Sequence, residues 1–261
     1  MEWIIMQNLM YDSLAVTIGP DADTIGAAAA DDFAASAASL LKERSEIAVI
    51  MATGNSQRGF RESIIGRDDI DWSRITILHL DEYVGVSGDR PESTSWRMQH
   101  DVVDHVRPKA FHAIDGTADP VEEMARYSRL LVELQPSICV LGVGENGHLA
   151  FNDPPADFET DELLIQAELS EASKKQIVGE GRFAAPGDVV PDQALTLTVP
   201  ALLEPEHLIV IVPDSRKAAA VKATLEGPIS PECPGSILRT VARARMYLDQ
   251  DSSALLEARQ R

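Results

Sequence analysis

Short runs of apolar residues with little polar alternation recur along the chain and predict buried β-strands. Four such runs lie at residues 46–54, 74–83, 137–144 and 207–215. The first run, EIAVIMATG, ends in small residues that indicate a turn, and the other three have the same character. Because the runs are almost wholly apolar, both faces of the sheet that they form should be covered.

Helical patterns occupy the sequence between these runs. The Ala-rich stretch 21–44 favours a helix because Ala has the highest intrinsic helix propensity. Further helices are expected at residues 58–65, 95–106, 121–134 and 215–226. Apolar strands that alternate with helices predict an α/β fold with a mostly parallel sheet and helices on both faces. The sequence shows no internal repeat, long linker or charge block, so residues 1–261 are expected to form a single domain.

The charge of the chain narrows the classes of partner. The 261 residues include 42 acidic and 23 basic side chains, which give a net charge of −19. Such a surface repels phosphate backbones and anionic lipid, so nucleic acid and membrane surfaces are poor partners. An anionic small molecule would have to be held by a few local cations and by backbone N–H groups.

The cysteines and the first residues of the chain indicate the cellular compartment of the protein. Cys139 and Cys233 are far apart in sequence and indicate neither a disulfide framework nor a zinc site. The opening stretch MEWIIMQNLMYDS lacks the basic segment and apolar run of a secretory signal peptide. No segment approaches the roughly 20 apolar residues of a membrane span. These features predict a cytoplasmic protein.

Ligands of open α/β sheets bind beyond the carboxyl ends of the strands, so the residues after each run are the first candidates for a site. Thr53, Gly54, Asn55 and Ser56 follow the first run. The glycine permits close backbone approach, and the hydroxyls and the N–H groups of the following helix suit a phosphate. The alternative is that these polar residues only cap that helix.

Two carboxylates, Asp81 and Glu82, end the second run. A carboxylate at the end of a buried strand is well placed to act as a general base. The alternative is that Asp81 caps a turn or pairs with a cation.

The stretch LGVGENGHLAFNDPP, residues 141–155, contains the third run's end and the turn after it. Its glycines let the backbone turn sharply and hold His148 close to the sheet edge, where the imidazole can transfer a proton near neutral pH. Asp153 follows five residues later and could fix the imidazole tautomer. The alternative is a structural histidine whose hydrogen bonds are satisfied within the fold.

Two isolated cations complete the candidates. Lys217 lies in the first turn after the fourth run, where the helix dipole does not favour a basic residue, and this indicates an anion nearby. Arg182 lies in the Gly- and Pro-rich segment GEGRFAAPGD. The alternative for both is a solvated surface position. The remaining histidines lack the spacing of a metal site, so no metal is predicted.

With these residues assembled, the chain resembles the glucosamine-6-phosphate deaminase/isomerase family, which is related to 6-phosphogluconolactonase. The resemblance covers most of the chain. It is carried, in the family's order, by LDEYVG with PES shortly after it, LGVGENGHLAFNDP, GRF, ALTLTVPALL and DSRKAAAVKATLEG. The segment GENGHLAFN, followed by an acid and Pro, is the most specific of these elements.

The resemblance implies a Rossmann-like three-layer fold and no cofactor. It implies that Asp81 is the base that moves a proton between C2 and C1 of the sugar. It implies that His148 catalyses ring opening, with support from Asp153 and Asn146. Glu82 and Gly147 lie directly beside these residues in sequence and are further site candidates.

The same resemblance implies a substrate and a clamp for its phosphate. The substrate is an amino-sugar 6-phosphate, which reacts with water to give a ketose 6-phosphate and ammonia. The clamp is formed by residues 53–56, Arg182 and Lys217. No nucleic acid or membrane takes part, and the sequence leaves the oligomeric state open, a homo-oligomer included.

The chain departs from the family's pattern at four places. Asp153 is one methylene shorter than the family's usual Glu, and Asn55 and Gln57 stand in a loop that is commonly Gly-rich and ends in Pro. Pro200 stands where many members have a small, flexible segment. The Arg/Lys-rich stretch that serves an allosteric site in some members has no counterpart in residues 157–169. These departures leave the sugar epimer and allosteric control open.

Two other functions compete with the deaminase. A 6-phosphogluconolactonase has a related motif around its His, but there a Thr-Ala-Ser-Leu-Phe-type run typically follows, whereas LAFNDP follows His148. A non-catalytic sugar-phosphate sensor would carry a DNA-binding helix-turn-helix. The roughly 20 residues before the first long helix are too few for one, and the net charge opposes DNA binding.

Overall fold

The computed structural model describes residues 6–185 and 187–257, and in this part of the chain eight strands form one sheet. Every neighbouring pair is parallel except the N-terminal hairpin of the first two strands. The order across the sheet is β1 (Gln7–Tyr11), β2 (Leu14–Ile18), β11 (Ala244–Leu248), β10 (His207–Val212), β7 (Ile138–Leu141), β3 (Ile47–Met51), β4 (Ile75–His79) and β6 (Ala110–His112).

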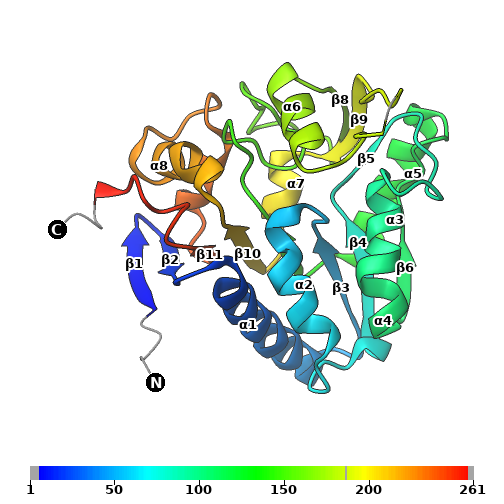
Figure 1. Cartoon of the computed structure of the whole chain (residues 1–261). Helices are drawn as coiled ribbons and strands as arrows, with labels where there is room; N and C mark the ends of the chain where they lie inside the picture. Colours follow the sequence, from blue (N-terminus) through cyan, green and yellow to red (C-terminus); the bar gives the residue numbers. More distant parts are fainter. Residues whose placement is uncertain (1–5, 186, 258–261) are drawn as a thin grey trace.

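Helices cover both faces of this sheet (Figure 1). Alternate residues of a strand point to opposite faces, so Val49 of β3 packs into one apolar cluster and Ile50 into another. The cluster around Val49 includes residues of α1 (Ala22–Glu43), α2 (Arg58–Ile65) and α3 (Thr94–Met98). The cluster around Ile50 includes residues of α5 (Pro120–Leu134), α7 (Val199–Leu203) and α8 (Ala218–Glu226). The predicted three-layer α/β architecture is confirmed.

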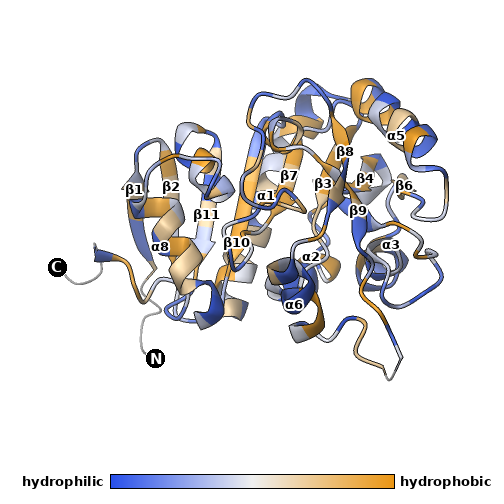
Figure 2. Cartoon of the chain, turned by 90° about the horizontal axis from the view of Figure 1, so that it is seen from above, coloured by the Kyte–Doolittle hydropathy of each residue, from blue (hydrophilic) through white to orange (hydrophobic). Residues whose placement is uncertain are grey.

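Figure 2, seen from above, shows hydrophobic colouring along the central strands β7 and β10. All four residues of β7 are buried, as are five of the six residues of β10. The apolar runs therefore mark the strands that helices cover on both sides, as the sequence predicts.

A second, antiparallel sheet lies at the carboxyl end of the main sheet (Figure 1). It consists of β5 (Asp81–Tyr83), β9 (Gln193–Leu197) and β8 (Leu164–Glu168), with α6 (Glu171–Gly179) beside it. The prediction of one continuous strand over residues 74–83 is wrong. The main-sheet strand ends at His79, and the chain then changes partner and pairs with β9.

Other boundaries also differ from the predictions. The helix expected at residues 95–106 is a short α3, a π-helical turn over Gln99–Val103 and a last turn, α4 (Asp104–Val106). The helix expected at 215–226 begins with a 3₁₀ turn over Ser215–Lys217. Strands β1 and β8 were not predicted because half or more of their residues are partly or fully exposed, and β6 has only three residues.

Candidate active site

A pocket opens where the strand order reverses. From β3 the chain continues outward to β4 and β6, and then returns to β7 on the other side of β3. Ligands bind at such a switch point in open α/β sheets, at the carboxyl ends of the strands. The residues that follow β3, β4, β7 and β10 meet there, as predicted. Seven candidates line the pocket: Thr53, Gly54, Ser56, Asp81, His148, Arg182 and Lys217.

A larger cavity, of about 580 Å³, lies elsewhere, beside α5 and α7. Its lining includes Leu131, Pro200 and several carboxylates, and none of the candidate site residues. An acidic cavity without a described cation is a poor place for an anion. The smaller pocket at the switch point therefore remains the candidate site.

Glycines shape the loop that holds His148. A Cβ on Gly144 would lie 2.2 Å from the Cε1 and Nε2 atoms of the His148 ring, so the ring rests directly on this glycine. Gly147 has φ of +88° and approaches Cys233, whose Sγ would lie 2.9 Å from an added Cβ. The loop is closed by a hydrogen bond from Gly144 N to the carbonyl oxygen of His148, 2.9 Å long. These contacts explain why the turn around His148 is rich in glycine.

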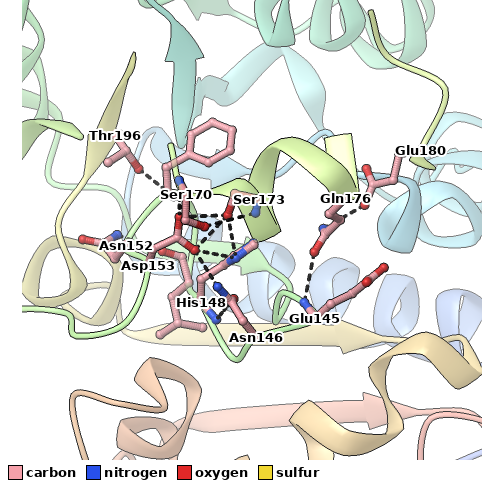
Figure 3. Close-up of polar contacts among 12 residues, drawn as sticks. Glu145, Asn146, His148, Asn152, Asp153, Ser170, Ser173, Gln176, Glu180 and Thr196 are labelled. Atoms are coloured by element: carbon pink, nitrogen blue, oxygen red, sulfur yellow. Dashed lines mark hydrogen bonds and ion pairs between the residues drawn. The ribbon is translucent and has the colours of Figure 1, made fainter. Parts of the chain in front are cut away.

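His148 is one member of a hydrogen-bonded group, shown in Figure 3. Its Nδ1 lies 3.3 Å from Asp153 Oδ1. Asn146 Nδ2 donates to the same carboxylate oxygen at 2.8 Å, and Asn146 Oδ1 accepts from His148 N at 3.1 Å. Ser173 Oγ lies 2.8 Å from both oxygens of Asp153. The expected pairing of His148 with Asp153 is present, and the shorter Asp side chain reaches the ring.

The Asp153 carboxylate stays charged in this setting. Burial raises the pKa of Asp153, but the hydrogen bonds from His148, Asn146 and Ser173 outweigh burial and hold that pKa well below its usual range. A charged Asp153 favours a proton on Nδ1 of His148. The other ring nitrogen, Nε2, is then free to exchange a proton with a ligand in the pocket.

Asp81 opens β5 and lines the same pocket. Burial raises the pKa of its carboxyl group to about 7, although Arg182 acts in the opposite direction. The Thr94 hydroxyl donates to the carbonyl oxygen of Asp81 and fixes the backbone at this residue. A carboxylate with a pKa near neutrality can accept a proton from carbon more effectively than an ordinary one.

Glu82 lies beside Asp81 in sequence but faces away from the pocket lining. It is fully buried, and its carboxylate accepts four hydrogen bonds. The donors are Tyr83 N at 2.9 Å, Ser93 Oγ at 2.6 Å, Thr94 N at 3.1 Å and Ser95 N at 2.9 Å. Glu82 therefore anchors the first turn of α3, where N–H groups lack partners within the helix.

The predicted phosphate loop follows β3 and leads through a 3₁₀ turn, Asn55–Gln57, into α2. Thr53, Gly54 and Ser56 line the pocket. Asn55 is not in the pocket lining, and its Nδ2 donates to the carbonyl oxygen of Glu180 at 3.1 Å. Arg61, buried in α2, donates to the Gly54 carbonyl at 2.8 Å and holds the loop from behind.

Arg182 and Lys217 are buried cations, 5% and 3% exposed. Arg182 donates to Tyr83 Oη at 3.3 Å and to the Thr53 carbonyl at 3.1 Å, and its Nε has no partner among the described residues. Within the same part of the chain neither side chain forms an ion pair. Buried charges without a paired carboxylate are costly unless an anionic ligand compensates them.

The pocket lining also includes residues that were not among the sequence candidates, and Tyr83, Gly144, Gln176 and Glu180 are examples. Gly144 and Tyr83 stand inside motifs that the sequence analysis had already singled out. Gln176 and Glu180 stand on or next to α6, and no pattern in their surroundings distinguishes them from solvated helix residues. Only the packing of α6 beside the second sheet, where Ile177 shares an apolar cluster with Tyr83 and Ala194, brings them to the site.

Residues 6–185 and 187–257 contain neither a candidate metal site nor a candidate membrane span. No three His, Cys, Asp or Glu side chains of these residues are grouped so as to hold a metal ion. No helix in the described residues has both the length and the apolar character to cross a membrane. The first residues of the opening stretch, 1–5, lie outside the described part.

The fold and the pocket together define a class of protein: an α/β enzyme whose site joins a carboxylate and an imidazole to buried cations that suit an anionic group. The chain belongs to the family of glucosamine-6-phosphate isomerases and 6-phosphogluconolactonase, whose family model matches residues 20–247.

Within this family, the chain is similar to proteins named glucosamine-6-phosphate deaminase. A glucosamine-6-phosphate deaminase from Exiguobacterium sibiricum is 35% identical over 207 residues, which are 79% of this chain and 80% of the relative. A glucosamine-6-phosphate deaminase from Streptococcus pneumoniae is 32% identical over 208 residues, 79% of this chain and 86% of the relative.

Solved structures give the same picture of the fold. A monomeric glucosamine-6-phosphate deaminase matches with a TM-score of 0.82 and 27% identity over 92% of this chain and 99% of that chain. A 6-phosphogluconolactonase from Thermotoga maritima matches with a TM-score of 0.72 and 18% identity over 90% of this chain and 99% of its own. The second likeness shows a shared fold.

Proposed function

We propose that this protein is a glucosamine-6-phosphate deaminase, which converts glucosamine 6-phosphate and water to fructose 6-phosphate and ammonia. The observation that carries the proposal is that Asp81, with a pKa near 7, shares one pocket with His148, Arg182 and Lys217. Relatives of 32–35% identity that are named glucosamine-6-phosphate deaminase support it.

The chemistry begins at the phosphate. The pocket residues of the 53–56 loop, Arg182 and Lys217 bind the phosphate dianion and compensate its charge. With the sugar held there, His148 Nε2 exchanges a proton with the ring oxygen and its neighbouring hydroxyl, so that the ring opens. Asp153 and Asn146 hold the loop and the imidazole for this step.

Asp81 then performs the isomerisation. Its carboxylate takes the proton from C2, and the electron pair of that C–H bond forms a C1–C2 double bond. The π pair of the C1 carbonyl moves to O1, which takes up a proton from water, and the product is an enolamine. The same carboxyl group returns the proton to C1, and the product is an imine at C2. Water adds to this imine, the C–N bond breaks, and the ketone and ammonia leave. Each step can be catalysed by acid–base groups without a cofactor, which suits Asp81 and His148 positioned in one pocket.

The related lactonase activity is the competing candidate, because the family's name includes it and the fold is shared. Hydrolysis of a lactone needs no base at a C–H bond, so it gives Asp81 no task. The segment LAFNDP after His148 also differs from the run expected in a lactonase.

An assay of ammonia release separates these functions. The purified protein is incubated with glucosamine 6-phosphate, with galactosamine 6-phosphate and with 6-phosphogluconolactone, and ammonia and lactone loss are followed. We expect ammonia from an amino-sugar phosphate and no lactone loss beyond the spontaneous rate. Rapid lactone hydrolysis without ammonia release would show that the protein is a lactonase.

A further inference from the structure

Helix α6 is fastened to the loop that carries His148 at two places (Figure 3). Gln176 Oε1 accepts a hydrogen bond from Glu145 N at 3.0 Å. At the start of the helix, Asp153 accepts from Ser170 N at 3.2 Å and from the Ser173 hydroxyl. The helix therefore lies against the acid–base group and contributes to its geometry.

The Ser173 hydroxyl lies within hydrogen-bonding distance of both His148 and Asp153. Ser173 is 1% exposed, and its Oγ is 2.8 Å from each oxygen of Asp153 and 3.3 Å from His148 Nδ1. The direct distance from Nδ1 to Asp153 Oδ1 is also 3.3 Å, which is longer than the usual 2.7–2.9 Å of a charge-assisted hydrogen bond. The shortest contacts of the carboxylate are thus those with Ser173 and Asn146.

The hydrogen positions follow from this arrangement. A hydroxyl has one proton, and the charged Asp153 carboxylate is its strongest nearby acceptor. The lone pairs of Ser173 Oγ then face His148 Nδ1 and can accept only from a protonated Nδ1. Ser173 and Asp153 consequently favour the same tautomer of His148, with the proton on Nδ1 and a free Nε2.

We propose that Ser173 is a positioning residue for His148: its hydroxyl, delivered by α6, orients the Asp153 carboxylate and fixes the His148 imidazole in the tautomer needed at the pocket. The role in turnover rests on the proposed deaminase function. The tautomer itself is a property of the free protein. The two can therefore be tested separately.

Three substitutions test this role. Ser173→Ala removes the hydroxyl and leaves the backbone of α6 unchanged. Ser173→Thr keeps a hydroxyl at this position and should keep most of the wild-type kcat and the wild-type tautomer of His148. Ser170→Ala is the matched control: it removes the N-cap hydrogen bond from Ser173 N to Ser170 Oγ, 3.1 Å long, but keeps the Ser170 N–H that Asp153 accepts. This control weakens the start of α6 but leaves the contacts of the Ser173 hydroxyl with Asp153 and His148 in place.

The first readout is steady-state ammonia release from glucosamine 6-phosphate. A partner that holds a catalytic histidine in the correct tautomer can contribute strongly to kcat. We expect Ser173→Ala to lower kcat about tenfold with KM within about twofold, and we expect Ser170→Ala to leave kcat near wild type. Equal loss of kcat in both variants, or no loss in Ser173→Ala, would show that Ser173 only supports the helix.

The second readout is the ¹⁵N chemical shifts of the His148 ring in the free protein. We expect the wild type and Ser170→Ala to hold the proton on Nδ1, and Ser173→Ala to shift the ring toward a mixture of tautomers. An unchanged ring spectrum in Ser173→Ala would overturn the positioning role. Because no substrate is present, this result stands even if the protein releases no ammonia, in which case the proposed function alone fails.

Discussion

At the scale of the residue, Asp81 and its environment set the pH range of activity. A base must be deprotonated to act, and burial raises the pKa of Asp81 to about 7. We expect kcat/KM to rise about tenfold per pH unit below pH 7 and to level off above it. The measurement is kcat/KM for glucosamine 6-phosphate from pH 5 to 9. An acidic limb near pH 4, the value of an ordinary carboxyl group, would contradict the environment described for Asp81.

The two buried cations predict a different kinetic effect. Arg182→Ala and Lys217→Ala should each raise KM because a charge-assisted contact with the phosphate is lost, which costs roughly 1.5–3 kcal/mol of binding. Lys222→Ala is the control, since Lys222 also belongs to the α8 region but pairs with Glu226 and Glu257 at the surface. Michaelis constants of the three variants decide the question. An unchanged KM in both Arg182→Ala and Lys217→Ala would show that the phosphate binds elsewhere.

At the scale of the element, the loop after β7 depends on the close approach of His148 to Gly144. A Cβ at Gly144 would stand 2.2 Å from the ring, so Gly144→Ala must displace the imidazole. We expect kcat to fall at least tenfold while the protein stays folded. Gly66→Ala is the control, because an added Cβ there has no neighbour within 4 Å and its φ is −94°. Wild-type kcat in Gly144→Ala would mean that the ring position is unimportant.

The start of α3 depends on the hydrogen bonds that Glu82 accepts from Ser93, Thr94 and Ser95. Gln in place of Glu82 would turn an NH₂ group toward backbone N–H donors, so at least one buried hydrogen bond to a charged group is lost. We expect Glu82→Gln to lower the free energy of unfolding by about 1.5–3 kcal/mol in urea titrations. Glu92→Gln, which removes a partly exposed pair with Arg90, should cost less than about 1 kcal/mol. Equal stabilities would show that the Glu82 network contributes little.

The elements also show what the sequence can and cannot predict. Apolar runs located β3, β4, β7 and β10 because helices cover these strands on both faces, and the polar residues after them then had to meet at one edge. Strand β5 was missed as a separate element because Asp81–Tyr83 follows the apolar run without a Gly or Pro between them, and only pairing with β9 separates β5 from β4. Ser173 was missed because a serine in a polar helix carries no signal until α6 is packed against Asp153.

At the scale of the whole molecule, a chain with a net charge of −19 keeps cations inside its pocket. The negative surface opposes nucleic acid and anionic lipid, and buried Arg182 and Lys217 attract an anion only at short range. The main sheet supplies the switch point, and the second sheet with α6 lies at its carboxyl end (Figure 1). Strand β5 brings Asp81 to the pocket, and α6 brings Ser173 to Asp153. Both sheets are therefore needed to assemble one acid–base site.

The central claim is that Asp81 is the base at C2 of an amino-sugar phosphate. The most direct test is the rate of solvent deuterium incorporation into the sugar, measured in D₂O with fructose 6-phosphate and ammonia. Asp81→Asn keeps the shape of the side chain but removes the base. Deuterium incorporation in this assay and ammonia release from glucosamine 6-phosphate should therefore both fall by about 10²–10⁴-fold. His148→Gln should retain more exchange than Asp81→Asn, because the open-chain ketose needs no ring opening. Deuterium incorporation at a near wild-type rate in Asp81→Asn would contradict the account.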